Sequence, residues 1–337
     1  MTGLPQFSPD GGLSLDFPLA DGLVTSRLAL GCMMFGEIWD SPSVSSGDRS
    51  RARAALETAL ELGWNFFDHA DIYCNGNSER VFGELVRELN LDRESIIIQG
   101  KCGIRFKGEP HPDSPKRFDY SREHIIASVD GILARLGMDY LDSLLLHRPD
   151  FLAEPEEIIA AFDQLRGMGK VRHFGVSNFT PHLLGLYRAA GFIPVANQVE
   201  VNLLRTALID CSMIESGRKP LPGHPGDGTL EWNRSHGVVT QAWAPMAYGY
   251  LCGREPDWEP ERVARLSAEV ARIARLHDAP AEAVVIGWLL RHPAMIQPVI
   301  GTRDPDRLRA CHQALKLNLS REEWYSLYSC SRGNELP

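Results

Sequence analysis

The chain has 337 residues, of which 44% are hydrophobic and 23% are charged, a balance that is ordinary for a globular protein. Its 35 basic and 44 acidic side chains give a net charge of −9, which argues against binding to nucleic acids and to acidic membrane surfaces. No stretch approaches the ~18 apolar residues of a membrane span and no early segment resembles a signal peptide, so we expect a cytoplasmic protein.

The first predicted element is a β-hairpin, in which residues 13–19 and 23–27 flank an Asp-Gly turn. After it, short apolar runs with strand character alternate with segments of helical periodicity. The predicted strands are residues 28–31, 65–67, 95–99, 141–146, 171–176, 194–198, 238–243 and 296–300. The predicted helices are residues 50–62, 78–89 (capped by Asn77 or Ser78), 121–136, 154–168, 181–190, 261–277, 281–291, 301–314 and 320–330. Residues 102–120 and 219–228 carry several Gly and Pro and are expected loops.

This alternation predicts an α/β protein whose strands pair in parallel through right-handed crossovers. Eight strand–helix units close naturally into a (β/α)8 TIM barrel. The alternative is an open doubly wound sheet, which would carry a Gly-x-Gly-x-x-Gly after an early strand, and the chain has none there. We expect residues 1–337 to form a single barrel domain, with residues 1–27 as an N-terminal hairpin cap and residues 315–337 as a C-terminal helix and tail.

Polar side chains follow three neighbouring strands of this predicted barrel. Asp68 follows the second strand, Lys101 the third and His147 the fourth. Tyr73 lies five positions after Asp68, in the next loop. Each has an ordinary interpretation alone: a capping aspartate, a solvated lysine, a core histidine and a half-buried loop tyrosine. Chemistry in such barrels sits at the carboxyl ends of the strands, so their convergence there indicates a candidate catalytic site.

These four groups suit one reaction, the protonation of a carbonyl oxygen during its reduction. A tyrosine has a pKa near ~10, and the ammonium of Lys101 is expected to lower the pKa of Tyr73 by favouring the phenolate. Asp68 would hold Lys101 charged and oriented, and His147 would donate a hydrogen bond to the carbonyl oxygen. No side chain donates hydride, so the reaction needs a cofactor.

The ends of the later strands carry groups that suit a nicotinamide cofactor. Ser177 and Asn178 follow the fifth predicted strand and Gln198 ends the sixth, and their side chains can hydrogen-bond a carboxamide. Trp243 ends the seventh and offers a broad face on which a ring can stack. These residues are therefore expected to hold the nicotinamide end of the cofactor.

The turn after the last predicted strand is the candidate phosphate site. Gly301 and Thr302 are expected at the start of the following helix, where backbone N–H groups and the helix dipole favour an anion. Arg303 and Arg307 are four residues apart, so we expect them on one helix face, where their guanidinium groups would bind a 2′-phosphate. This arrangement predicts a preference for NADPH over NADH.

Together these stretches resemble the aldo-keto reductase family over nearly the whole chain. The matching segments are residues 63–73 (GWNFFDHADIY), 100–103 (GKCG), 144–149 (LLLHRP), 175–179 (GVSNF), 197–198 (NQ) and 243–245 (WAP). The resemblance implies an NADP(H)-dependent reductase of aldehydes or ketones with the catalytic tetrad Asp68, Tyr73, Lys101 and His147. The cofactor contacts that it implies at strand ends also include Gly31, Cys32, Met33, Ala244 and Pro245.

The chain departs from the family pattern at two of these places. Trp243 stands where the family usually stacks a tyrosine on the nicotinamide. Ala310 and Cys311 stand where the family often carries a Glu and an Asn that contact adenine. The adenine end of the cofactor is therefore expected to be held differently here.

The C-terminal tail is too short to supply the loop that often closes the substrate pocket of the family. Residues 102–120 and 219–228, together with Trp39 and His69, are expected to shape the pocket instead. The expected partner is a small-molecule carbonyl substrate, and the expected assembly is a monomer or a weak oligomer.

Two other functions fit parts of the sequence. A metal-dependent barrel hydrolase would draw ligands from Asp68, His69, Asp71 and His147, but the first predicted strand lacks the usual His-x-His. The seven scattered cysteines include no Cys-x-x-Cys pair, which indicates reduced thiols, and we expect no metal. The second alternative is a redox-sensing NADP(H)-binding subunit with weak turnover.

Three cysteines, Cys32, Cys74 and Cys102, follow strand ends near the candidate site. A thiol close to Lys101 is expected to have a lowered pKa and therefore a reactive thiolate. Oxidation or alkylation of such a thiol would then block the pocket.

Overall fold

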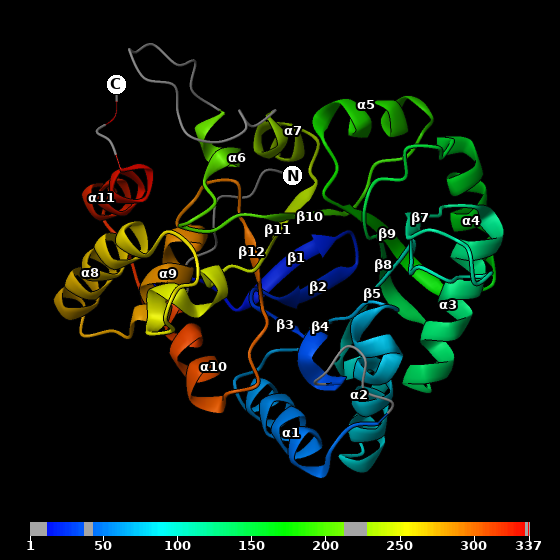
Figure 1. The fold of residues 1–337 in the computed structure, drawn as a ribbon, viewed down its shortest axis with the longest axis horizontal. Helices are drawn as coiled ribbons and strands as arrows, with labels where there is room; N and C mark the ends of the chain where they lie inside the picture. The colour runs from blue at the N-terminus through cyan, green and yellow to red at the C-terminus, as the bar shows by residue number, and fades with distance from the viewer. Residues whose placement is uncertain (1–11, 37–42, 212–227, 334–335, 337) are drawn as a thin grey trace.

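A computed structural model describes residues 12–36, 43–211, 228–333 and 336 of the chain. Within them, eight parallel strands close into a barrel and helices cover its outside (Figure 1), which confirms the predicted (β/α)8 fold. In chain order, the barrel strands are β3 (Ala29–Gly31), β4 (Phe66–Asp68), β5 (Ile97–Cys102), β8 (Leu141–Leu146), β9 (Val171–Ser177), β10 (Ala196–Glu200), β11 (Val239–Trp243) and β12 (Gln297–Ile300).

The helices bury apolar side chains against the barrel, as α2 does with Val81, Phe82 and Leu85. The α-helices of the described residues are α1 (Ser46–Glu61), α2 (Asn77–Glu88), α3 (Arg122–Leu136), α4 (Pro155–Gly167), α5 (Pro181–Ala189), α6 (Ala207–Asp210), α7 (Thr229–Ser235), α8 (Pro260–Leu276), α9 (Ala281–Leu290), α10 (Pro305–His312) and α11 (Arg321–Arg332). Short 3-10 turns are η1 (Met33–Gly36), η2 (Tyr73–Gly76), η3 (Arg93–Ser95), η4 (Ala247–Cys252) and η5 (Gln313–Lys316). None of the described helices is long and apolar enough to cross a membrane.

The predicted hairpin, β1 (Asp16–Ala20) and β2 (Leu23–Ser26), is present and antiparallel. Its turn contains Gly22 with φ 74°, a conformation that glycine adopts without strain. Leu19 and Leu23 of the hairpin are buried in one cluster with Phe66 and Ala196, which stand at the starts of β4 and β10. The hairpin therefore closes the amino end of the barrel and leaves the carboxyl ends of the strands, with the candidate site residues, at the opposite end.

Local boundaries differ from the predictions where tertiary contacts take over. Strand β5 extends to Cys102, so Lys101 lies within a strand. The N-cap of α2 is Gly76, and the prediction of Asn77 or Ser78 is wrong, because the Ser78 hydroxyl is used elsewhere: it donates to the carbonyl of Met33 at 2.7 Å. The expected loop 102–120 contains a small hairpin, β6 (Ile104–Arg105) and β7 (Arg117–Phe118), and most of loop 219–228 lies outside the described residues.

Candidate active site

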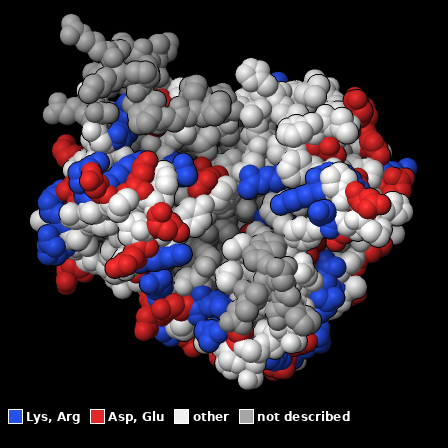
Figure 2. Space-filling model, in the orientation of Figure 1, with Lys and Arg blue, Asp and Glu red and all other residues white. Residues whose placement is uncertain are grey.

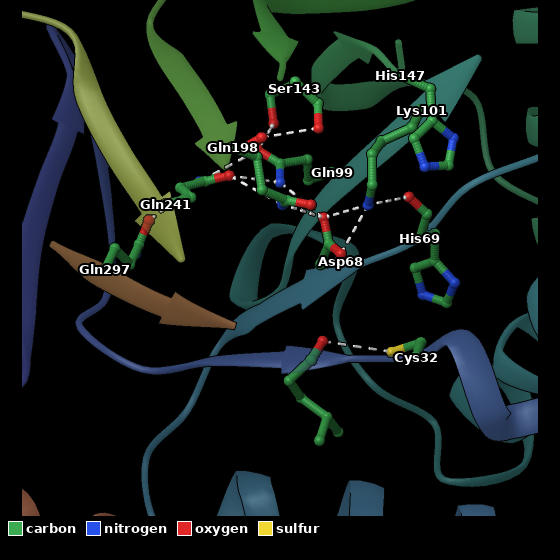
Figure 3. Close-up of polar contacts among 12 residues, drawn as sticks. Cys32, Asp68, His69, Gln99, Lys101, Ser143, His147, Gln198, Gln241 and Gln297 are labelled. Atoms are coloured by element: carbon green, nitrogen blue, oxygen red, sulfur yellow. Dashed lines mark hydrogen bonds and ion pairs between the residues drawn. The ribbon is translucent and has the colours of Figure 1, made fainter. Parts of the chain in front are cut away.

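An ion pair between Asp68 and Lys101 lies at the carboxyl end of β4 (Figure 3). Strands β4 and β5 are parallel neighbours, so the two side chains reach the same place. Lys101 Nζ lies 2.7 Å from Oδ1 and 2.6 Å from Oδ2 of Asp68, and it donates to the backbone carbonyl of His69 at 2.8 Å. Only 1% of the Lys101 side chain and 3% of the Asp68 side chain are exposed, so solvent screens the pair very little.

Tyr73 lies beside this ion pair at the start of η2. The Lys101 ammonium is 5.1 Å from the centre of the Tyr73 ring. Burial alone lowers the pKa of Lys101, but Asp68 and Tyr73 outweigh it and leave that pKa raised, so the lysine stays charged. Burial raises the pKa of Tyr73, and Lys101 offsets this only in part. The expectation of a lowered Tyr73 pKa is therefore wrong, and the phenol keeps its proton at neutral pH.

His147 completes the group directly after β8. Its ring centre lies 5.9 Å from that of Tyr73, and the two rings stand at 84° to each other. Burial, followed by the charges of Lys101 and Arg148, lowers the pKa of His147 well below its ordinary value. The imidazole is therefore neutral at physiological pH and carries one N–H that can donate to an oxygen held beside Tyr73.

The turn that carries Tyr73 has a strained backbone. Cys74 (φ 49°), Asn75 (φ 53°) and Gly76 (φ 81°) follow it in the left-handed region. Such a conformation costs roughly 1–3 kcal/mol for a residue other than glycine, and persists only where the surroundings hold it. Close packing supplies this hold, since a Cβ on Gly36 of η1 would come within 2.5 Å of the Cβ of Cys74. The turn brings the chain from Tyr73 directly into α2 and fixes the phenol above the ion pair.

Ser177, Asn178 and Trp243 lie together at the ends of β9 and β11. Trp243 Nε1 donates to Asn178 Oδ1 at 3.1 Å, and Asn178 Nδ2 donates to Ser177 Oγ at 2.7 Å. Asn178 Nδ2 also donates to the carbonyl oxygen of His147 at 3.4 Å, which connects this group to the candidate catalytic residues. The fourth expected member, Gln198, is only 2% exposed and donates to Asp68 Oδ1 at 3.0 Å, so the structure places it beneath the ion pair and not on the open face.

The other expected cofactor contacts at strand ends lie on turns. Gly31 ends β3, Met33 is 38% exposed in the turn that follows, and Cys32 between them is fully buried. Ala244 has φ 49° directly after β11, and Pro245 follows it, so the chain turns sharply out of the strand. Of these residues, Cys32 offers no side-chain surface to a ligand.

The turn before α10 differs from the expectation in two ways. The helix begins at Pro305, so Arg303 precedes it and does not share a helix face with Arg307. The carboxylate of Asp304 accepts the backbone N–H of Asp306 at 2.9 Å and that of Arg307 at 3.4 Å. The expected open amides are thus already paired, because the sequence places a capping aspartate directly before the helix.

The side chains of this turn are the groups that remain for an anion. A Cβ on Gly301 would meet no atom within 4 Å, so the backbone there faces free space. The Arg303 side chain is 16% exposed and pairs with the buried Asp48 at 3.3 Å. The Arg307 side chain is 46% exposed, and its contact with the exposed Asp304 is longer, at 3.9 Å. Thr302 lies directly before Arg303, and its Oγ1 accepts the backbone N–H of Asp304 at 3.2 Å. Arg307 is therefore the more available cation.

Of the two residues expected in the substrate pocket, Trp39 lies outside the described residues and His69 is not in the pocket. The His69 ring is fully buried and packs edge-on against Phe82 of α2, with 4.6 Å between ring centres. Burial, and then Lys101, lowers the pKa of His69 to about 3. His69 follows Asp68 directly, and successive residues of an extended chain face opposite sides, so His69 points toward the helices.

The residues considered as metal ligands do not converge either. Asp68 is held by Lys101, and His69 packs against α2, so the two side chains leave β4 in different directions. Across the described ranges, no group of three or more His, Cys, Asp or Glu side chains is arranged to hold a metal ion. The site geometry thus gives the hydrolase interpretation no ligand set.

The three cysteines near the site are buried, and the expected lowered thiol pKa is wrong. Burial raises the pKa of Cys32 and Cys102 well above the ordinary value, and it also raises the pKa of Cys74. Lys101 does lower the pKa of Cys32, but by less than burial and Asp68 raise it. These thiols are therefore poor targets for oxidation or alkylation.

Two arginines at this end of the barrel were not identified from the sequence. Arg148 lies 5.6 Å over the Trp243 ring and has no ion-pair partner among the residues that the structure describes. Arg254 and Arg307 each approach to 3.7 Å from a Cβ built on Gly249 of η4. Figure 2 shows Lys and Arg side chains on both sides of the hollow in the middle of the face that it draws. Arg148 could have been identified from the sequence, because it lies close after a predicted strand. Arg254 could not, because only packing brings it to α10.

Asp71, in the same turn as Tyr73, gives a pH-dependent prediction. Burial, and then the charge of Glu79, raises the pKa of Asp71 to about 8, although Arg135 opposes this. An unfolded Asp titrates near ~3.9, so the folded chain holds a proton that the unfolded chain releases between these values. Stability should therefore fall as pH rises from about 4 to 8, and Asp71→Asn should remove this loss. Urea unfolding of the wild type and of Asp71→Asn at pH 5 and pH 8 tests this. If the two proteins differ in free energy of unfolding by the same amount at both pH values, the prediction is wrong.

Comparison with known proteins agrees with this geometry. Residues 27–332 match the Aldo/keto reductase family. The chain is 32% identical to 6-dehydroglucose reductase of Agrobacterium fabrum over 94% of this chain and 98% of that protein. It is 34% identical to oxidoreductase YdhF of Escherichia coli, over 84% of this chain and 88% of that protein. Its fold matches that of a glycerol dehydrogenase from Gluconobacter oxydans with a TM-score of 0.78 and 21% identity over 98% of both chains. The chain therefore belongs to the aldo/keto reductase family of oxidoreductases.

Proposed function

We propose that this protein reduces the carbonyl group of a small aldehyde or ketone to an alcohol, with NADPH as its cofactor. The observation that carries the proposal is the buried Asp68–Lys101 pair beside Tyr73 and His147. A phenol that keeps its proton, a charged lysine next to it and a neutral imidazole are the groups that carbonyl protonation needs.

In the proposed reaction, the carbonyl oxygen accepts hydrogen bonds from the Tyr73 hydroxyl and from the N–H of His147. Negative charge develops on this oxygen as the carbonyl carbon is reduced, and Tyr73 transfers its proton to it. Lys101 stabilises the phenolate that remains, and Asp68 keeps Lys101 charged and in place. The nicotinamide, when bound, supplies the hydride.

The residues at the ends of β9, β11 and β12 fit a dinucleotide. The partly exposed Asn178 offers an amide for a carboxamide, and the partly exposed Trp243 offers a ring face. The Ser177 hydroxyl is buried and already donates to the carbonyl of Gln198 at 2.8 Å, so it supports Asn178 from behind. Gly301 leaves free space at the last strand, and Arg307 offers an exposed guanidinium for a phosphate. The net charge of the chain is −9, so these local cations, and not the overall charge, would attract the cofactor.

Replacing Arg307 by Ala is expected to weaken NADPH binding by roughly one to two decades, the usual worth of a charge-assisted hydrogen bond of about 1.5–3 kcal/mol. NADH lacks the 2′-phosphate, and its dissociation constant should barely change. Arg303→Ala should have a smaller effect, because Asp48 already holds and neutralises this guanidinium. Fluorescence titration of both cofactors at one salt concentration measures these constants.

Arg309→Ala is the matched control, since Arg309 lies on the same helix but pairs with Asp306 and Glu61 on the exposed side. It changes the net charge equally and should leave NADPH binding nearly intact. If Arg307→Ala weakens NADH and NADPH alike, or if Arg309→Ala has the same effect, Arg307 does not bind the 2′-phosphate.

The proposed function itself is tested by NADPH oxidation with a panel of aldehydes, ketones and quinones, with NADH measured beside it. Sustained turnover of one carbonyl class supports the reductase. Tight NADPH binding with slow turnover of every carbonyl would favour the alternative, a redox-sensing subunit. Absence of binding to either cofactor would contradict both.

A further inference from the structure

Four glutamines occupy the inside of the barrel between the hairpin and the Asp68–Lys101 pair (Figure 3). They are Gln99 of β5, Gln198 of β10, Gln241 of β11 and Gln297 of β12, and each is at most 2% exposed. Gln198, Gln241 and Gln297 are direct register neighbours in adjacent parallel strands. Polar amides in a barrel interior cost free energy unless they are hydrogen-bonded, so their pairing is informative.

The lower end of this series is attached to the hairpin. Gln297 Nε2 donates to the backbone carbonyl of Ser26 and to Thr25 Oγ1, each at 2.9 Å. Gln297 Oε1 accepts from Gln241 Nε2 at 3.0 Å. The hairpin that closes the amino end of the barrel is thereby connected, through Gln297, to the Gln241 side chain on β11.

The upper end of the series is attached to Asp68. Gln241 Oε1 accepts from Gln99 Nε2 at 2.9 Å and from Gln198 Nε2 at 3.1 Å. Both of these nitrogens also donate to Asp68 Oδ1, at 2.7 Å from Gln99 and 3.0 Å from Gln198. Ser143 Oγ donates to Gln99 Oε1 at 3.2 Å and holds that amide from the side of β8.

The orientation of every amide in the series is determined by its two ends. The carbonyl of Ser26 can only accept, so Gln297 must turn its nitrogen toward the hairpin and its oxygen toward Gln241. The same requirement then passes to Gln241, whose oxygen faces Gln99 and Gln198. A single flipped amide would place two oxygens or two N–H groups against each other, which is costly in a buried site. The ordered amides therefore present two N–H donors to the Asp68 carboxylate.

We propose that this amide relay, made of Gln99, Gln198, Gln241 and Gln297, positions Asp68 so that it pairs with Lys101 in the catalytic geometry. The inference rests on the proposed carbonyl reduction, because it concerns the same site. Gln99 and Gln241 act through Asp68 and Lys101 and do not touch the substrate, so they are positioning residues. The relay also makes the hairpin, at the far end of the barrel, part of the support of the active site.

The test is Gln241→Leu, which keeps a similar volume and removes the central hydrogen bonds of the relay. We expect kcat for carbonyl reduction to fall about ten- to hundredfold, the effect of one to two lost hydrogen bonds near the reacting groups, with KM changed less than about twofold. Ser143→Ala removes one donor to Gln99 and disturbs the fold less, and we expect a fall of about two- to fivefold. Ser143→Ala decides the test if Gln241→Leu does not fold.

A double-mutant cycle separates positioning from a merely structural role. If the relay acts through Lys101, Gln241→Leu or Ser143→Ala should cost little further rate in a Lys101→Met background, measured by single turnover. Thr240→Val is the matched control: Thr240 precedes Gln241 on β11, is buried, and accepts from Asn233 Nδ2 at 3.0 Å outside the relay. This variant should lose stability and keep kcat.

The inference would be overturned if Gln241→Leu and Ser143→Ala lower the rate by the same factor in the Lys101→Met background as in the wild type. It would also be overturned if neither variant changes kcat. A wild-type protein without carbonyl reduction would instead contradict the proposed function. The two failures are therefore distinguishable, because the relay is judged only against a wild-type rate that has been measured.

Discussion

Replacing Tyr73 by Phe is expected to lower kcat for carbonyl reduction by roughly 10²–10⁴-fold, the usual worth of a positioned general acid. The variant keeps the ring, whose centre lies 5.9 Å from that of His147, and removes only the hydroxyl beside Lys101. The pocket shape should therefore survive, and the dissociation constant of NADPH should stay nearly unchanged. Steady-state rates and cofactor titration on the same preparation measure both quantities.

Tyr325→Phe is a suitable control, because it removes an equivalent hydroxyl far from the ion pair. Tyr325 lies on α11 with 39% of its surface exposed. The Tyr325→Phe variant should reduce carbonyls at the wild-type rate. Near-wild-type reduction by Tyr73→Phe would show that another group protonates the oxygen, and the assignment of the four catalytic residues would then fall.

Lys101→Met should abolish most activity and lower the free energy of unfolding by about 3–5 kcal/mol, the usual cost of leaving one member of a buried ion pair unpaired. Both partners are at most 3% exposed, so solvent cannot replace the lost ammonium. The charge of Lys101 lowers the pKa of Tyr73, and its removal should raise that pKa further. The basic limb of the pH–rate profile should therefore move to higher pH.

The double variant Asp68→Asn/Lys101→Met is the control, since it removes both charges and leaves no unpaired carboxylate. It should recover most of the lost stability but not the activity. An unchanged pH–rate profile with retained activity in Lys101→Met would mean that the lysine has only a structural role.

The stability difference between wild type and Lys101→Met should itself depend on pH. The pKa of Lys101 is raised in the folded protein, so its contribution is complete below the unfolded value of about 10.4 and is lost as pH rises through the folded value. The difference should therefore narrow above pH ~10.4, which unfolding at pH 8 and above pH 10.5 would show. A difference that stays constant would argue against a charged Lys101 as the stabilising group.

The positions of the proposed catalytic residues along the strands could be predicted from local sequence. Asp68, Lys101 and His147 each follow or end a short apolar run, and a parallel barrel brings all such ends to one rim. Their protonation could not be predicted in the same way. Burial decides the protonation states. At Tyr73, burial outweighs the charge of Lys101, so the pKa of Tyr73 is raised where the sequence predicted that it is lowered.

Side-chain direction was the weakest part of the prediction. His69 and Gln198 were both expected to face a ligand at a strand end. His69 directly follows β4 but packs against Phe82 of a helix, and Gln198 lies within β10 and donates to Asp68 inside the barrel. A shift of one residue along a strand reverses the face, so a position near a strand end does not determine what a side chain contacts. The same limit applies to Arg303, which an aspartate cap and Asp48 hold outside the helix that was expected to carry it.

The sequence alone determined the order of strands and helices, the closing hairpin and the rim at which the four proposed catalytic residues lie. These features follow from periodicity, turn residues and strand ends, which are local. Tertiary structure decided the protonation of Tyr73, the burial of the cysteines and the amide relay from Ser26 to Asp68. The relay joins residues more than a hundred positions apart in the chain, as Gln99 and Gln241 are. Desolvation and amide orientation arise only when such distant groups share one interior, so no local pattern in the chain records them.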